Sequence, residues 1–256
     1  MLKALLWDVD GTLAETERDG HRVAFNRAFA TAGVPWRWDE AHYGELLQVS
    51  GGRERLLHDM SRRADAPDIP QECVALAAQL HGLKNSFYEE IVRGGELRLR
   101  AGVCELFADC LEAGVRLAIA TTTSGGNVEA LLGQHLGSAW RRQFAAVVCA
   151  EEAPRKKPDP QVYQLALAQL QLRPQEVVAM EDAPAGVMAA GAADIKVVVA
   201  HSYYFPAPAY GRALASGPSL GSGAGWQPRA AVSAQRITLE QIVSWQKRAA
   251  GERRAS

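Results

Sequence analysis

The sequence has no long apolar run and no excess of charge of one sign. Its longest apolar runs, such as 115–120, are about six residues, whereas a membrane-spanning helix needs roughly 20. The 28 Lys and Arg residues are balanced by 29 Asp and Glu residues, so the composition does not indicate a broad basic surface for nucleic acid. We therefore expect a protein that neither crosses a membrane nor binds nucleic acid.

Cysteine is scarce, and no two cysteines form the C-x-x-C pattern of zinc sites. The four are Cys73, Cys104, Cys110 and Cys149. The N-terminal apolar run reaches an acidic residue at Asp8, too early for a signal peptide. We expect buried or inert thiols in a cytoplasmic protein, or in a protein of the plastid stroma if the source is a photosynthetic eukaryote and the chain is mature.

The 256 residues are enough for one or two domains, and 48% are hydrophobic, as in globular proteins. Short apolar runs without alternation indicate parallel strands that are covered on both faces. Helical patterns lie between most of these runs, which predicts an α/β fold with a parallel sheet. The predicted strands are 4–7, 115–120, 146–150, 177–180 and 195–200.

The stretch from about residue 15 to 95 has no strand pattern. It carries only helical patterns, at 22–32, 39–48, 53–63 and 71–92. We therefore predict an all-helical domain over 16–96, inserted into a discontinuous core of residues 1–15 and 97–256.

The C-terminal part of the predicted core is rich in Gly and Pro over 202–235, which predicts an extended or partly disordered segment. Thr238 and Gln241 have the spacing of a capping box, which predicts the start of a final helix. The polar tail 251–256 is expected to fray.

Asp8 and Asp10 follow the first predicted strand directly. Residues two apart in an extended chain project to the same side, so both carboxylates are expected at the carboxyl edge of the sheet. Paired carboxylates repel one another unless a proton or cation lies between them, and Mg²⁺ prefers such oxygen ligands. The pair alone is also compatible with an acidic turn at Gly11.

Three further polar clusters follow later strands. Thr121–Ser124 offers hydroxyl groups for phosphate oxygens or for a helix N-cap. Arg155–Pro158 either supplies a cation to the site or is a solvated loop. Glu181 and Asp182 either bind a metal or cap the helix that follows. Each cluster is ambiguous alone, but their order and their positions at strand ends are specific together.

In these four motifs the chain resembles the haloacid dehalogenase (HAD) superfamily over about residues 3 to 200. The resemblance implies a Rossmann-type sheet with a helical C1 cap. It also implies that Asp8 is the nucleophile, that Asp10 is the acid and base, and that Thr121 and Lys157 hold the phosphoryl group. Lys157 is preferred to Lys156 because it precedes a proline. The implied Mg²⁺ ligands are Asp8, Asp10 and Asp182, with the backbone carbonyl of Asp10 completing the metal site and Glu181 acting through water.

Within this superfamily, segments 15–26 and 50–55 and the helix with His81, Lys84 and Tyr88 resemble the CbbY-type enzymes. Characterised members dephosphorylate xylulose 1,5-bisphosphate, an inhibitor of Rubisco. The resemblance therefore implies a sugar bisphosphate substrate, ribulose 5-phosphate plus phosphate as products, and a functional link to Rubisco without direct binding. The implied substrate-binding residues are Asp8, Asp10, Glu17, Ser50, Gly51, Gly52, Arg53, Arg55, Lys84, Thr121, Thr122 and Lys157.

Alternatives stay open at this point. A β-phosphoglucomutase-like mutase shares this core and cap, and a phosphoglycolate-type or promiscuous phosphatase is a second possibility. A catalytically inactive binding protein is disfavoured, because all four motifs keep their charged residues. His21, His58 and His81 are expected to be structural or surface residues, and Tyr43 to be a core residue. We expect a monomer.

Overall fold

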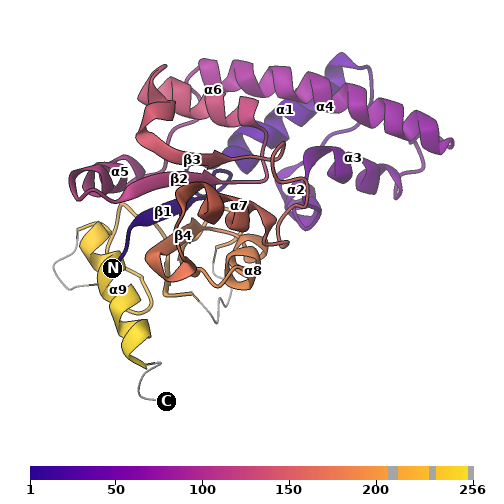
Figure 1. The fold of residues 1–256 in the computed structure, drawn as a ribbon. Coiled ribbons are helices and arrows are strands. Elements are labelled where there is room, and N and C mark those ends of the chain that lie inside the picture. The colour runs from indigo at the N-terminus through magenta and orange to yellow at the C-terminus, as the bar shows by residue number, and fades with distance from the viewer. Residues whose placement is uncertain (207–212, 231–234, 253–256) are drawn as a thin grey trace.

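A six-stranded, fully parallel sheet lies at the centre of the molecule (Figure 1). The structure is a computed structural model, and it describes residues 1–206, 213–230 and 235–252. The strand order is β3-β2-β1-β4-β5-β6, which confirms the predicted α/β fold. The strands are β1 (Ala4–Trp7), β2 (Arg116–Ala120), β3 (Phe144–Val148), β4 (Val177–Glu181), β5 (Lys196–Ala200) and β6 (Ala215–Gly217).

Helices cover both faces of the sheet, because side chains along each strand alternate between the faces. Leu5 and Trp7 of β1 belong to one apolar cluster, whereas Ala4 and Leu6 belong to the other. Helices α5 (Val103–Glu112), α6 (Gly125–Leu136) and α9 (Leu239–Glu252) pack in the first cluster, and α7 (Gln161–Leu170) and α8 (Pro184–Ala192) in the second. Two short 3₁₀ helices, η2 (Trp140–Gln143) and η3 (Pro174–Glu176), precede β3 and β4.

Between β1 and α5, every regular element from residue 17 to residue 93 is a helix, as predicted. These elements are a π-helical turn η1 (Glu17–His21), α1 (Arg22–Thr31), α2 (Glu40–Leu46), α3 (Gly52–Met60) and α4 (Pro70–Arg93). We call residues 16–96 the helical insertion; these limits remain a prediction.

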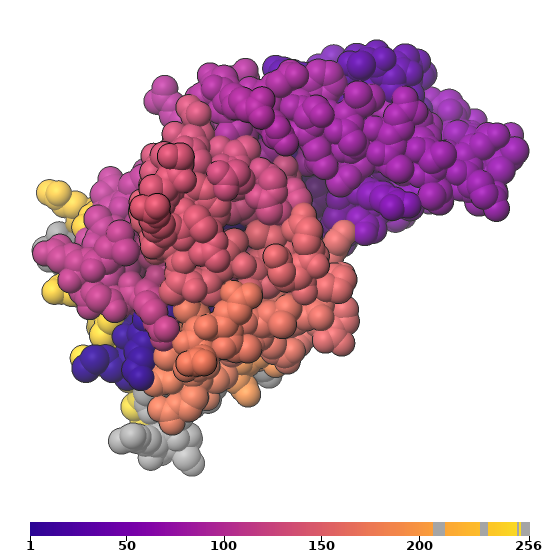
Figure 2. Space-filling view, turned by 45° about the horizontal axis from the view of Figure 1, so that its top comes forward, coloured from indigo at the N-terminus to yellow at the C-terminus, as the bar shows by residue number. Residues whose placement is uncertain are grey.

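The helical insertion has an apolar cluster of its own. Its aromatic rings pack closely, with the Phe25 and Trp38 centroids 4.7 Å apart. In the space-filling view the indigo and purple residues of the insertion project to one side of the later, pink to orange residues (Figure 2). The insertion is therefore placed to cover one edge of the sheet without joining it.

The Gly/Pro-rich segment after β5 contains regular structure that the sequence did not predict. Its strand β6 pairs with β5, and Ser216 forms a bridge with Gln227. Trp226 stacks on Trp245 of α9 with ring centroids 5.3 Å apart. Gly217 is required here, because a Cβ would lie 2.3 Å from the Trp226 ring. These residues therefore form a short strand and its packing within the segment that was predicted to be extended or partly disordered, while 207–212 and 231–234 lie outside the described part of the chain.

The C-terminal helix begins where the spacing predicts it. The backbone N–H of Gln241 donates to Thr238 Oγ1 over 3.3 Å, as an N-cap interaction does. Residues 251 and 252 remain helical, and the rest of the predicted tail, 253–256, lies outside the described residues.

All four cysteines are free thiols. Cys110 and Cys149 are buried, as expected, but Cys104 is exposed. Cys104 lies next to the buried Val103 in the first turn of α5, on a side of the helix that does not face the sheet. Among the described residues no helix combines the length and the apolar character needed to cross a membrane.

Candidate active site

Asp8 and Lys157 form a buried ion pair at the carboxyl edge of the sheet. Asp8 follows β1, and its Oδ1 lies 2.6 Å from Lys157 Nζ. The same ammonium lies 2.7 Å from Glu181 Oε1 at the end of β4. Tyr163 of α7 also donates to this Glu181 oxygen. Glu181 is thus held by two protein donors, which suits a residue that positions Lys157.

Three carboxylates meet beside Lys157. Oxygens of Asp8, Glu181 and Asp182 all lie within 4.8 Å of one another. Thr12 Oγ1 lies 3.3 Å from Asp8 Oδ2 and 3.2 Å from Asp182 Oδ1, so one hydroxyl links two of them. Gly11 has φ +82°, and a Cβ there would come 2.1 Å from Asp182 Oδ2. Only glycine leaves Asp182 this close to the chain after β1.

This cluster carries more negative charge than its protein cation balances. Burial raises the pKa of Asp8 to about 7, against the opposing charge of Lys157. Burial and the charge of Asp8 likewise raise the pKa of Asp182 well above its usual value. Carboxylate oxygens with uncompensated charge are the donor set that Mg²⁺ prefers. Asp8 and Asp182 therefore fit a divalent cation, with Glu181 beside them.

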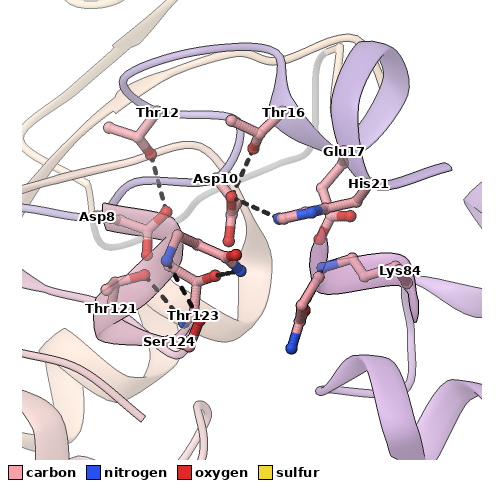
Figure 3. Close-up of polar contacts among 12 residues, drawn as sticks. Asp8, Asp10, Thr12, Thr16, Glu17, His21, Lys84, Thr121, Thr123 and Ser124 are labelled. Atoms are coloured by element: carbon pink, nitrogen blue, oxygen red, sulfur yellow. Dashed lines mark hydrogen bonds and ion pairs between the residues drawn. The ribbon is translucent and has the colours of Figure 1, made fainter. Parts of the chain in front are cut away.

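The side chain of Asp10 lies apart from the three carboxylates and contacts the helical insertion. Its Oδ1 accepts from Thr16 Oγ1 at 2.6 Å and lies 3.0 Å from His21 Nε2, both in the helical insertion (Figure 3). Burial opposes ionisation of Asp10, but the charge of His21 and the hydrogen bonds from His21 and Thr16 outweigh burial and lower the pKa of Asp10. The carboxylate next to Asp8 in the sequence is thus turned toward the insertion.

The hydroxyl cluster after β2 divides into two roles. Thr121 is buried near Asp8 in Figure 3, and its Oγ1 accepts from the N–H of Thr123 over 3.3 Å. Ser124 caps α6 by accepting from the N–H of Asn127. Ser124 is therefore a helix cap, whereas Thr121 and Thr122 remain as candidates for phosphate contact.

A second buried network lies in the insertion, where Arg55 binds Glu17. Two guanidinium nitrogens of Arg55 lie 3.0 and 3.1 Å from the two oxygens of Glu17. Tyr43 donates to the same carboxylate and accepts from Arg55 over 2.9 Å. Burial raises the pKa of Glu17, but the charge of Arg55 outweighs burial and lowers it. The charge of Arg55 is thus already neutralised by the protein.

Two cavities adjoin at this interface. One, of about 480 Å³, contains the three carboxylates, Lys157 and Ser50, whose hydroxyl donates to the Lys157 carbonyl over 2.9 Å. The other, of about 360 Å³, is lined by charged side chains of both signs, among them Arg53 and Lys84 but also Glu54, and by the chain after β2. Both are lined by Asp10, Glu17, Arg55 and Thr122, so the two volumes meet at these side chains.

The second cavity combines cations with backbone N–H groups. Lys84 is buried, with its ammonium 5.1 Å from the centre of the Tyr88 ring, and burial lowers its pKa to about 8. Arg53 is exposed at the rim, and Gly51 and Gly52 open helix α3 beside it. A helix N-terminus with adjacent cations is suited to an anion.

Three residues near the cavities were not predicted as part of the site. His21 contacts Asp10, Tyr43 contacts Glu17, and Lys156 forms an ion pair with Glu54 across the second cavity. His81 lines that cavity too, and burial lowers its pKa to about 4. Their positions follow from the packing of the insertion against the core, and no local pattern in the sequence marks them.

The family is decided by comparison with known proteins. Residues 2–194 match the model of the haloacid dehalogenase-like hydrolases. The chain belongs to this family. It is 43% identical over 230 residues to the plasmid protein CbbY of Cupriavidus necator, and the match covers 89% of each protein.

Two solved structures are also similar to this haloacid dehalogenase-like hydrolase. The CbbY of Rhodobacter sphaeroides in complex with phosphate is 39% identical, with a TM-score of 0.76 over 83% of this chain and 92% of that one. A mutant of that CbbY in complex with xylulose-(1,5)bisphosphate is 38% identical, with a TM-score of 0.80 over 88% and 97%. The family resemblance inferred from the motifs is confirmed.

Proposed function

We propose that this hydrolase is a Mg²⁺-dependent phosphatase that removes one phosphate group from a sugar bisphosphate, with xylulose 1,5-bisphosphate as substrate. The observation that carries the proposal is the pair of adjoining cavities. One holds Asp8 and Lys157, and the other offers Lys84 and Arg53 to a second anion. The named ligand of the similar CbbY complex supports the same substrate.

The proposed chemistry begins at Asp8. Its carboxylate attacks phosphorus, the P–O bond to the sugar breaks, and an aspartyl phosphate forms. Lys157 and Thr121 hold phosphoryl oxygens as charge develops on them. Asp8, Asp182 and the backbone carbonyl of Asp10 would hold Mg²⁺, which would supply positive charge to offset the repulsion between the carboxylate and the phosphate dianion.

Asp10 is assigned proton transfer. Thr16 and His21 both contact its Oδ1, so we assign to Oδ2 the proton that Asp10 gives to the leaving sugar oxygen and later recovers from water. Water attacks the aspartyl phosphate, and its proton passes to Asp10 while Asp8 is regenerated. Only P–O bonds change, so the sugar keeps its configuration and the immediate product is xylulose 5-phosphate. The ribulose 5-phosphate implied by the resemblance then requires a separate epimerisation at carbon 3.

The distal phosphate is assigned to the second cavity. Lys84, Arg53 and the N–H groups at Gly51 and Gly52 are its proposed ligands. Glu17 is proposed to accept hydrogen bonds from sugar hydroxyls where the cavities meet. Arg55 is proposed to orient Glu17, because its guanidinium is committed to that carboxylate.

A phosphate-release screen over sugar monophosphates and bisphosphates with Mg²⁺ tests this function. We expect the highest kcat/KM for xylulose 1,5-bisphosphate, and loss of turnover in Asp8→Asn with an unchanged circular dichroism spectrum. Net isomerisation of a sugar monophosphate would identify a mutase instead. A preference for phosphoglycolate would identify another phosphatase, because that substrate leaves Lys84 without a second phosphate.

The cellular setting follows from the same substrate. We propose a functional link to Rubisco through removal of an inhibitory sugar bisphosphate, without contact between the proteins. The similarity to bacterial CbbY proteins supports a cytoplasmic location. Xylulose 1,5-bisphosphate accumulation in cells that lack this protein is the corresponding measurement.

A further inference from the structure

An ion pair joins the core to the helical insertion beside the proposed catalytic lysine. Lys156 Nζ lies 2.7 Å from Glu54 Oε1, in the first turn of α3. Lys156 directly precedes Lys157 in the chain, yet the two ammonium groups have different partners. Lys157 faces the three carboxylates, whereas Lys156 faces the second cavity.

The backbone of the insertion leaves room for this pair. Gly51 has φ +100°, and a Cβ built on it would lie 2.2 Å from both Lys156 Nζ and Glu54 Oε2. A side chain at Gly51 would therefore occupy the position of the ion pair. Because Gly51 also lines the second cavity, Lys156 lies against the helix N-terminus that is proposed to receive an anion.

Lys156 differs from the other cations nearby in how firmly it is held. Arg55 is bound by both oxygens of the largely buried Glu17 side chain, and Lys157 by two buried carboxylates. The partner of Lys156 is a carboxylate whose side chain is 48% exposed. Ion pairs of this kind are weak, since water and salt screen them. A phosphate dianion, with twice the charge, can replace Glu54 at Lys156.

We propose that Lys156 is a ligand of the distal phosphate, and that Glu54 holds this lysine in place until the phosphate displaces it. The inference rests on the proposed bisphosphatase function. In this proposal Lys156 selects the substrate and takes no part in the phosphoryl transfer. Its ammonium contacts the phosphate that stays on the sugar, so its loss affects bisphosphates and not simple monoesters.

The proposal requires opposite effects at the two ends of the ion pair. Lys156→Met should raise KM for xylulose 1,5-bisphosphate about tenfold, the effect of one lost charged hydrogen bond. Glu54→Gln should lower that KM by about threefold, because the lysine no longer exchanges a partner. In both variants kcat should stay within about twofold, and KM for p-nitrophenyl phosphate should not change.

A remote ion pair provides the control, because its carboxylate can be replaced in the same way. Lys3 and Glu176 also lie 2.7 Å apart, at the opposite end of the sheet from the site, and Glu176→Gln makes the same chemical change. This control should leave both KM values unaltered. If Lys156→Met and Glu54→Gln instead move KM in the same direction on both substrates, the pair is only a clamp between insertion and core, and the proposal is overturned.

A double variant and a binding measurement complete the test. In the Lys156→Met background, Glu54→Gln should have no further effect on KM, because Glu54 acts through Lys156. If the parent protein does not hydrolyse xylulose 1,5-bisphosphate, the proposed function fails. The same variants are then compared by calorimetric titration with that bisphosphate and Mg²⁺. Equal dissociation constants for parent and Lys156→Met would overturn the assignment of Lys156.

Discussion

His21 Nε2 lies 3.0 Å from Asp10 Oδ1, so a residue of the helical insertion holds a carboxylate of the core. The His21 ring stacks on Tyr88 of α4, with ring centroids 4.2 Å apart. The orientation of Asp10 therefore depends on how the insertion packs on the sheet. Asp8, only two residues away, is oriented by core residues alone.

His21→Ala is expected to lower kcat for phosphate release about 100-fold, because Asp10 loses the group that orients it and lowers its pKa. KM should change by less than threefold or so, since His21 is not assigned to binding. The activity profile should also shift to higher pH, as the pKa of Asp10 rises. Steady-state kinetics across pH measures all three.

His58→Ala is the control for this variant, because His58 is a half-buried histidine on α3 and does not line either cavity. It should keep the kinetics of the parent. A fall in kcat for His21→Ala with no change of pH profile would show that the histidine is structural only.

We expect substrate binding to depend on pH, because the ammonium group of Lys84 is buried. Burial lowers its pKa to about 8, so the ammonium is charged below pH 8 and loses its proton above it. The substrate phosphates are dianions throughout this range. KM for the bisphosphate should therefore rise about tenfold from pH 7 to pH 9, as the charged fraction falls.

Lys84→Arg keeps its charge over the same pH range, so its KM should vary little between pH 7 and pH 9. Initial rates at several substrate concentrations and pH values measure the difference. If KM of the two proteins rises in parallel, another group titrates and Lys84 is not the distal ligand.

Arg55→Ala is expected to reduce stability. Arg55 is paired with Glu17, and the two side chains are only 11% and 17% exposed. Removing one partner leaves the other carboxylate buried and unpaired, which costs about 3 kcal/mol in the free energy of unfolding. Urea denaturation measures this loss, and the double variant with Glu17→Gln should recover part of it.

An exposed pair on α4 gives the matched comparison. Arg93 and Glu89 lie 2.9 Å apart, with 72% and 41% of their side chains exposed. Arg93→Ala should change the free energy of unfolding by less than about 0.5 kcal/mol. Unchanged stability in Arg55→Ala would mean that Arg55 is available to substrate after all.

Gly11→Ala is expected to damage the proposed metal site. A Cβ at Gly11 would meet Asp182 at 2.1 Å, in addition to the strain of φ +82°. Gly33 has φ +68° but no atom within 4 Å of its Cβ position, so Gly33→Ala adds the strain without the clash. The strain alone costs about 1–2 kcal/mol.

We expect the free energy of unfolding to fall further in Gly11→Ala than in Gly33→Ala. Gly11→Ala should also need a higher Mg²⁺ concentration to reach the same rise in Tm. Urea denaturation measures the free energy of unfolding, and the rise of Tm with added Mg²⁺ measures the Mg²⁺ requirement. The same Mg²⁺ response in both variants would contradict the assignment of Asp182 to the metal.

Local patterns were sufficient for much of the fold. Unalternated apolar runs marked five of the strands within a few residues, because a parallel sheet buried on both faces needs apolar side chains throughout. The helices of the insertion showed their amphipathic spacing in the same way. Strand β6 was not predicted. Its Gly217 leaves room for the ring of Trp226, which comes later in the chain after a loop, so no local pattern indicates the strand.

For the site, the sequence by itself determined that the carboxyl groups of Asp8 and Asp182 follow apolar strands, and that Lys157 lies in the polar stretch between β3 and α7. It could not determine where side chains turn, because that depends on contacts between distant segments. Only the tertiary structure directed Asp10 to His21, committed Arg55 to Glu17 and placed Lys156 over Gly51. In each case a charged group has an oppositely charged partner within reach, and packing of the insertion on the core decides which partner that is.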